Sequence, residues 1–210
     1  MQIDLLFECT EATNIALLIA YCLLPIGAIF ALMKILMVCL GNICRSPLAE
    51  GILKYKAKQA ELPWKIDSAG TNGYHIGEPP HHLSQKVARL NGIDICDQRA
   101  RRFTADDFKN YDKIYAMSAD VIDEMKRIAR NKFDAGKVDL LMNELNPGKN
   151  MDVPDPWYGP EPGYHQVYKM IDEACDAVVR KYGRTSNSDL GPLSTGHGNP
   201  NTQSTIRNSQ

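Results

Sequence analysis

Residues 38–47, VCLGNICRSP, decide the fold of this chain. The apolar run Ile35–Val38 leads into them and predicts a buried β-strand. Ser46 and Pro47 predict the cap and the first residue of a helix. Between the strand and the helix lies a loop of the form Cys-x5-Arg, starting at Cys39, whose backbone N–H groups can all turn inward on one anion. A thiol at the base of an anion-binding loop suits chemistry on a phosphate group.

Composition sets the class of protein. The chain has 210 residues, of which 44% are hydrophobic and 23% charged, so one domain with a sizeable core is expected. A net charge of −1 gives no overall attraction to nucleic acid or anionic lipid. The six cysteines are too few and too irregular for a disulfide scaffold, and no Cys-x2-Cys pair indicates zinc. A reactive thiol is typical of a reducing compartment, so a cytoplasmic location is expected.

Three regions are predicted. Residues 1–32 form an apolar extension, because the chain from Asn14 to Met33 is almost wholly apolar and long enough to span a membrane. Three interpretations of this extension stay open: a membrane anchor, an extra packed helix and an over-extended reading frame. Against an anchor, the strand expected from Lys34 would follow a membrane span directly, with no linker between them. Residues 33–183 form the folded domain, and residues 184–210 form a disordered polar tail.

Strands and helices alternate through the folded domain. The predicted elements are the strand 35–38, a helix to Leu62–Pro63, the strand Lys65–Gly70, a surface loop 71–80, a helix ended by Asn91-Gly92, an acidic turn 104–108, the strand Lys113–Met117, a helix capped by Ser118, the strand Val138–Met142, a Pro-rich loop 152–162 and a closing helix 167–182. This order predicts a three-layer α/β fold, with a small parallel sheet of about four strands, helices on both faces and a phosphate-binding loop after the first strand.

Three motifs together resemble those of the low-molecular-weight protein tyrosine phosphatases. They are CLGNICRSP at residues 39–47, DSAGT at residues 67–71 and DPWY at residues 155–158. The resemblance runs from about Met33 to Tyr182. It implies a hydrolase that removes phosphate from phosphotyrosine proteins or aryl phosphate monoesters through a phosphocysteine intermediate, with no cofactor. No nucleic-acid partner is expected for such a protein. Contact with a membrane is expected only if residues 14–33 are a genuine anchor. The sequence does not indicate an oligomeric state.

Three residues are predicted to carry the catalysis. Cys39 is the expected nucleophile, because inward N–H groups at a helix N-terminus favour the thiolate, which is the form that attacks phosphorus. Arg45 can hold two phosphate oxygens with its planar fork of donors, which a lysine could not do. Asp155 is the expected general acid and then the base that activates water, with Asp152 as a nearby rival.

The residues around these three are expected to bind phosphate and to support the loop. The phosphate-binding set is Leu40, Gly41, Asn42, Ile43, Cys44 and Arg45. Asn42 tolerates a left-handed backbone, and Ser68 is a plausible partner for its side chain. Ser46 is expected to cap the helix and to donate its hydroxyl to the Cys39 thiolate.

Tyr74, Trp157 and Tyr158 are expected to line the rim, where aromatic walls suit a phenyl phosphate and set a depth that phosphoserine cannot bridge. The family usually has tyrosine in place of Trp157, so rim selectivity is expected to differ. Many relatives carry a histidine near Gln98 that supports the phosphate-binding loop. This chain has no histidine there, so the same support is not expected. His81 and His82 are expected to be solvated, and the histidines form no metal site.

Cys44 adds a possible redox function, because in this family such a cysteine can close a reversible disulfide with the nucleophile; a small apolar filler is the alternative. Two other activities use the same scaffold. Thioredoxin-coupled arsenate reductases need two further cysteines, and only Cys96 lies in the relevant region. Protein-arginine phosphatases carry threonine where this chain has Ile43, which favours phosphotyrosine. A phosphate-binding module without activity would lack the cysteine, the arginine or the aspartate.

Overall fold

The computed structural model describes residues 32–183 of the chain. The predicted extension, apart from Leu32, and the predicted polar tail lie outside the described residues. None of the helices within residues 32–183 has the length and the apolar character that a membrane span requires.

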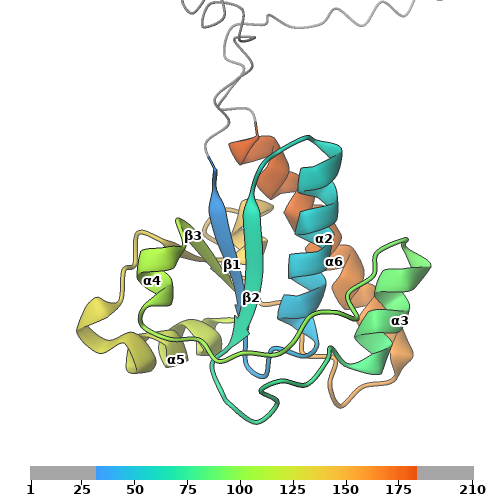
Figure 1. Ribbon diagram of the computed structural model, residues 1–210, viewed down its shortest axis with the longest axis horizontal. Coiled ribbons are helices and arrows are strands. Elements are labelled where there is room, and N and C mark those ends of the chain that lie inside the picture. The colour runs from blue at the N-terminus through green and yellow to red at the C-terminus, as the bar shows by residue number, and fades with distance from the viewer. Residues whose placement is uncertain (1–31, 184–210) are drawn as a thin grey trace, which may run out of the picture.

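A parallel sheet of four strands forms the centre of the domain (Figure 1), which confirms the predicted α/β fold. The strands are β1 (Lys34–Cys39), β2 (Lys65–Gly70), β3 (Lys113–Ala116) and β4 (Val138–Leu140), in the order β2-β1-β3-β4. All three pairings are parallel. The chain leaves β1 towards β2 on one side and later crosses to β3 on the other. The carboxyl end of β1 is therefore a switch point of the sheet, the place where open α/β sheets bind ligands.

Helices cover both faces of the sheet, as predicted. In chain order they are α2 (Arg45–Gln59), α3 (His82–Leu90), α4 (Asp107–Asn110), α5 (Ala119–Ala129), the 3-10 turns η1 (Arg130–Lys132) and η2 (Leu141–Glu144), and α6 (Glu161–Tyr182). Figure 1 shows α2 and α6 side by side on one face, and α4 and α5 on the other.

The two faces of β1 build two separate cores. Ile35 and Met37 pack with α2 and α6, whereas Leu36 and Val38 pack with α5 and the segment around α4. Because side chains alternate along a strand, a continuous apolar run is what a strand covered on both faces needs. All four residues are fully buried.

The ends of several elements differ from the prediction. Helix α2 begins at Arg45, before the predicted cap Ser46, and the N-cap position falls on Cys44 without a side-chain hydrogen bond. The helix ends at Gln59, before the predicted stop at Pro63. Glu61, which lies between the helix and β2, has a left-handed backbone with φ 54°. Ser118 does precede α5 but makes no capping bond there.

The fourth strand is also shorter than predicted. It stops at Leu140, and the following residues form the 3-10 turn η2. An apolar run predicts burial but does not distinguish a strand from a buried turn. In the described part of the chain β4 is an edge strand, paired with β3 alone.

Candidate active site

The loop after β1 and the first turn of α2 surround the sulfur of Cys39. Asn42 has φ 58°, a left-handed conformation that asparagine tolerates, and its backbone N–H donates to Cys39 Sγ at 3.2 Å. Ser46 Oγ lies 3.0 Å from the same sulfur and is fully buried. The sulfur therefore accepts from a loop N–H and is hydrogen-bonded to a hydroxyl group of the helix that follows.

A cavity of about 230 Å³ opens above this sulfur. Its floor is formed by Cys39 and by members of the predicted phosphate-binding set, namely Leu40, Gly41, Ile43, Cys44 and Arg45. Asn42 lies behind the loop instead, almost fully buried. The structure thus brings the predicted set together, with Asn42 placed to support the loop.

The side chain of Asn42 joins the loop to its surroundings. Its Nδ2 donates to Ser46 Oγ at 2.9 Å and to Ser68 Oγ at 2.8 Å. Its Oδ1 accepts from the backbone N–H of Arg101 at 2.9 Å. Ser68 is thus placed where the sequence expects a partner for Asn42. The side chains of Asn42, Ser46 and Ser68 are buried, where a satisfied polar network holds one geometry.

Arg45 and Asp155 meet at the mouth of the cavity. Arg45 Nη2 lies 2.6 Å from Asp155 Oδ2, although 110 residues separate the two in sequence. The arginine side chain is only 7% exposed, whereas that of Asp155 is 41% exposed and also accepts from the backbone N–H of Trp157 at 3.2 Å. The rival Asp152 faces elsewhere, because its Oδ1 accepts from the backbone N–H of Ala119 and so caps α5. That capping bond replaces the one expected from Ser118.

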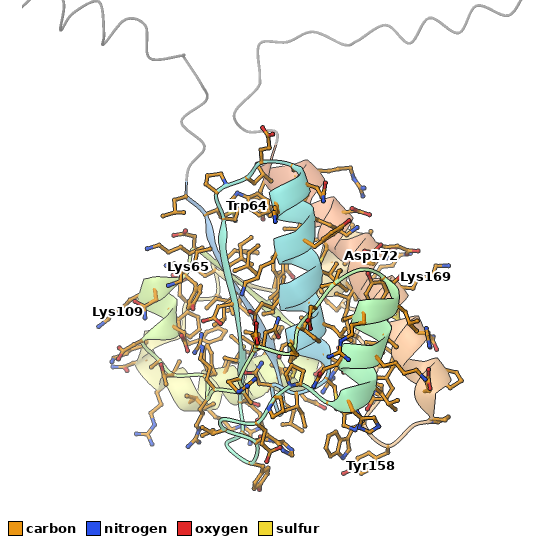
Figure 2. All side chains as sticks on the ribbon, turned by 45° about the vertical axis from the view of Figure 1, so that its right-hand side comes forward. Trp64, Lys65, Lys109, Tyr158, Lys169 and Asp172 are labelled. Atoms are coloured by element: carbon orange, nitrogen blue, oxygen red, sulfur yellow. The ribbon has the colours of Figure 1, made fainter. Side chains whose placement is uncertain are left out.

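Aromatic side chains form the rim, as placed by the sequence. Tyr74, Trp157 and Tyr158 all line the cavity, with relative exposures of 84%, 38% and 96%. Figure 2 shows Tyr158 at the opposite end of the molecule from Trp64, which precedes β2. His75 was not predicted, yet it lines the same cavity and its ring lies 5.4 Å from that of Trp157.

His81 is packed, and the expectation that it is solvated was wrong. Its ring centroid lies 5.2 Å from that of Trp157 and 5.3 Å from that of Tyr164, on which it stacks. Burial and the neighbouring His82 lower the pKa of His81. The ring stays neutral near pH 7, which suits a ring packed between two aromatic side chains.

Cys44 lies beneath the loop as a buried free thiol. Its sulfur is 3.8 Å from the hydroxyl of Tyr164. Burial raises the pKa of Cys44 to about 12, so the thiol keeps its proton at neutral pH. Of the other described cysteines, Cys175 is buried and Cys96 lies beside Asp94 and Asp97, which raise its pKa. None of these thiols is paired in a disulfide within residues 32–183.

Two supporting residues escaped the sequence analysis. Glu50 is a buried carboxylate. The sequence feature that could have indicated its burial is its position four residues after Ser46 and three before Leu53, on one face of the helix. Arg101 supports Asn42 through its backbone, which no side-chain pattern reveals. Gln98 does not replace the histidine of many relatives, since its Oε1 is buried without a hydrogen-bond partner in the described part of the chain.

The described residues contain no group of three or more His, Cys, Asp or Glu side chains placed to hold a metal ion. The cavity brings together a thiol, a guanidinium and a carboxyl group around an anion-binding loop. That set can displace a phosphoryl group and hydrolyse the product without a further group.

Comparison with known proteins gives a consistent result. Residues 34–187 match the family described as low molecular weight phosphotyrosine protein phosphatase. The protein of that name from Gallus gallus is 36% identical over 150 residues, which cover 70% of this chain and 94% of the relative. The low molecular weight protein-tyrosine-phosphatase YfkJ of Bacillus subtilis has the same identity and coverage.

Solved structures agree with the sequence comparison. A protein tyrosine phosphatase from Entamoeba histolytica superposes with a TM-score of 0.66 at 36% identity, covering 72% of this chain and 97% of that one. The structure of YfkJ superposes with a TM-score of 0.67 at 33% identity, covering 73% and 96%.

Proposed function

The chain belongs to the low molecular weight phosphotyrosine protein phosphatase family, and from this membership and the site geometry we propose that Cys39, Arg45 and Asp155 catalyse hydrolysis of phosphotyrosine. The observation that supports this assignment best is the meeting of Arg45 and Asp155 above the sulfur of Cys39. Two segments far apart in sequence converge on one anion-binding loop. Neither a structural ion pair nor a buried inert thiol accounts for that convergence.

In the first step the Cys39 thiolate attacks phosphorus while the bond from phosphorus to the phenolic oxygen breaks. The phosphate dianion replaces the Asp155 carboxylate as the partner of Arg45, which holds two of its oxygens through the transition state. Once displaced from Arg45, Asp155 takes up a proton from solvent, and at the mouth of the cavity it donates that proton to the leaving phenolate oxygen. A phosphocysteine and a free tyrosine side chain result.

In the second step water hydrolyses the phosphocysteine. Asp155 now accepts a proton from the attacking water, and the bond from sulfur to phosphorus breaks. Ser46 Oγ, 3.0 Å from the sulfur, donates to the thiolate as it leaves. Inorganic phosphate is released and the enzyme returns to its starting state.

The rim supports a preference for aryl phosphates. Tyr74, Trp157 and Tyr158 give the cavity aromatic walls, and aromatic rings in contact favour each other beyond the area they bury. We infer a cytoplasmic location, because a catalytic thiol must stay reduced, and phosphotyrosine proteins as the substrate class.

The assignment is tested with a phosphotyrosine peptide and p-nitrophenyl phosphate as paired substrates. Cys39→Ser is expected to abolish turnover of both. Asp155→Ala is expected to lower kcat/KM on the peptide by about 10²-fold or more, and to lower kcat/KM less on p-nitrophenyl phosphate, whose leaving group needs a proton less. Asp152→Ala is the matched control and should keep the same ratio of rates as the wild type. Full activity of Cys39→Ser, or equal losses of kcat/KM on both substrates for Asp155→Ala, would contradict the assignment.

A further inference from the structure

Trp157 is held between two histidines at the rim of the catalytic cavity. Its ring centroid lies 5.4 Å from that of His75 and 5.2 Å from that of His81. Both imidazoles are tilted against the indole, at 52° and 58°, and both separations lie within the range at which aromatic side chains attract each other. The mechanism described above gives neither histidine a function.

Each histidine also contacts the phosphate-binding loop. A Cβ placed on Gly41 would lie 3.2 Å from His75 Cδ2, so the edge of that imidazole lies directly against the loop backbone. The backbone N–H of His81 donates to the carbonyl oxygen of Ile43 at 2.8 Å. The two histidines therefore bridge the phosphate-binding loop and the indole of Trp157.

Both histidine side chains are fixed in place. His75 Nδ1 lies 2.9 Å from Glu78 Oε2, and the carbonyl oxygen of Glu78 accepts from the backbone N–H of Ala100 at 2.9 Å. The ring of His81 stacks on that of Tyr164 with an interplanar angle of 17°. His81 Nδ1 is buried without a hydrogen-bond partner in the described part of the chain, so packing holds this ring. Neither imidazole can turn away from the indole without losing these contacts.

The backbone of Trp157 in turn orients the carboxyl group of Asp155. The N–H of Trp157 donates to Asp155 Oδ1 at 3.2 Å, within a turn that is closed by a bond from the Gly159 N–H to the carbonyl oxygen of Pro156 at 2.9 Å. The other carboxyl oxygen, Oδ2, lies 2.6 Å from Arg45 Nη2. Because Oδ1 already accepts a hydrogen bond, Oδ2 is the oxygen left to carry the catalytic proton. The position of Trp157 therefore sets where Oδ2 lies.

We propose that His75 and His81 are positioning residues that register Trp157 against the phosphate-binding loop. Through the backbone of Trp157 they hold Asp155 Oδ2 where it protonates the leaving oxygen. The proposal rests on the assignment of Asp155 as the general acid. When the substrate phosphate displaces Asp155 from Arg45, the carboxyl group loses its ion pair, and the Trp157 N–H is the contact that still orients it. An acid that is misplaced by a fraction of an ångström transfers its proton more slowly.

The test compares phenyl phosphate with p-nitrophenyl phosphate, which share one ring and differ in the leaving group. Phenolate is the stronger base, so its departure depends more on the acid. His75→Ala and His81→Ala are each expected to lower kcat/KM on phenyl phosphate roughly two- to tenfold, the range that follows from loss of one aromatic contact. On p-nitrophenyl phosphate the loss should be less than about twofold. His82→Ala, which removes an exposed imidazole next to His81, is the matched control and should keep the wild-type ratio of the two rates. His81→Phe keeps a flat ring against Trp157 and should restore that ratio.

The same substitutions in Asp155→Ala separate positioning from a general structural effect. A residue that acts through Asp155 has nothing to position once the carboxyl group is gone, so His75→Ala should leave the ratio of Asp155→Ala unchanged. Thermal unfolding is recorded for every variant. The proposal is overturned if folded His75→Ala and His81→Ala keep the wild-type ratio, if His82→Ala shifts it equally, or if His75→Ala changes it further in Asp155→Ala. Failure of the proposed function is a separate result, because it would appear as turnover by Cys39→Ser or as a wild-type ratio in Asp155→Ala itself.

Discussion

Gly70, the last residue of β2, is predicted to be the position where a single methyl group damages the site most. A Cβ placed there would lie 2.9 Å from the backbone carbon of Gly41, 2.9 Å from the carbonyl oxygen of Leu40 and 3.0 Å from the backbone nitrogen of Asn42. These are main-chain atoms of the phosphate-binding loop, and they cannot move aside as the end of a flexible side chain can. Ordinary contact begins at 3.4 Å, so the loop must shift by about 0.5 Å.

Two losses follow for Gly70→Ala. Overpacking of this kind destabilises by about 1–3 kcal/mol, and each kcal/mol lowers the melting temperature by about 2–4 °C in a domain of this size. A misplacement of 1 Å can cost about 10²-fold in rate, so half that distance is expected to lower kcat on p-nitrophenyl phosphate roughly tenfold. Stability is measured by thermal unfolding and kcat by steady-state kinetics at saturating substrate.

Gly73→Ala is the matched control for this prediction. A Cβ at Gly73 would meet two side chains at ordinary contact distance, the end of the exposed Ile76 at 3.4 Å and Arg102 Cδ at 3.9 Å. Its kcat should stay within about twofold of the wild type, because no loop atom is displaced. If Gly70→Ala kept wild-type kcat and melting temperature, the inference that β2 holds the phosphate-binding loop by direct backbone contact would be wrong.

Three further predictions concern the buried thiol and the aromatic rim. Because the pKa of Cys44 is raised to about 12 by burial, Cys44 should resist alkylation at neutral pH while Cys39 reacts, as read by mass spectrometry of the two labels. The folded state holds that proton more tightly than the unfolded state, so Cys44 should also make stability fall as the pH rises above about 9, measured by urea unfolding. His81→Ala removes ring contacts to Trp157 and Tyr164 worth about 0.5–1.5 kcal/mol each, and should lower kcat/KM on a phosphotyrosine peptide about two- to tenfold. His82→Ala, at the exposed neighbour, should change it less than twofold, and equal losses would argue against the packing of His81 on Trp157.

The parts of the fold that depend on local pattern were predictable. A continuous apolar run gave β1, and the loop form Cys-x5-Arg placed the cavity at its end. Lys65–Gly70 was predicted with its observed bounds. Helix ends were less predictable, because α2 stops where Glu61 takes a left-handed conformation, and no residue type there requires it.

The parts of the site that depend on tertiary packing were not predictable from local pattern. His81 is polar and stands at a helix start, which is typical of a solvated side chain, yet it packs against rings from two distant segments. Glu50 was hidden because a single carboxylate among apolar residues changes a helical pattern little. Asp155 was predicted through the family motif, whereas the capping function of Asp152 appears only once α5 is in place.

The ion pair between Arg45 and Asp155 has a consequence for biosynthesis. During translation the phosphate-binding loop is complete more than a hundred residues before its acid, and Tyr164, which contacts Cys44, follows later still. Contacts of such long sequence separation form late, because closing the intervening loop has an entropic cost. A nascent chain with only the first strand and helix has the proposed nucleophile and the proposed phosphate-binding arginine but lacks the proposed proton donor. Full hydrolytic activity therefore arises only after the carboxyl-terminal third has docked, and a chain truncated before residue 153 should be unable to complete the reaction at a useful rate.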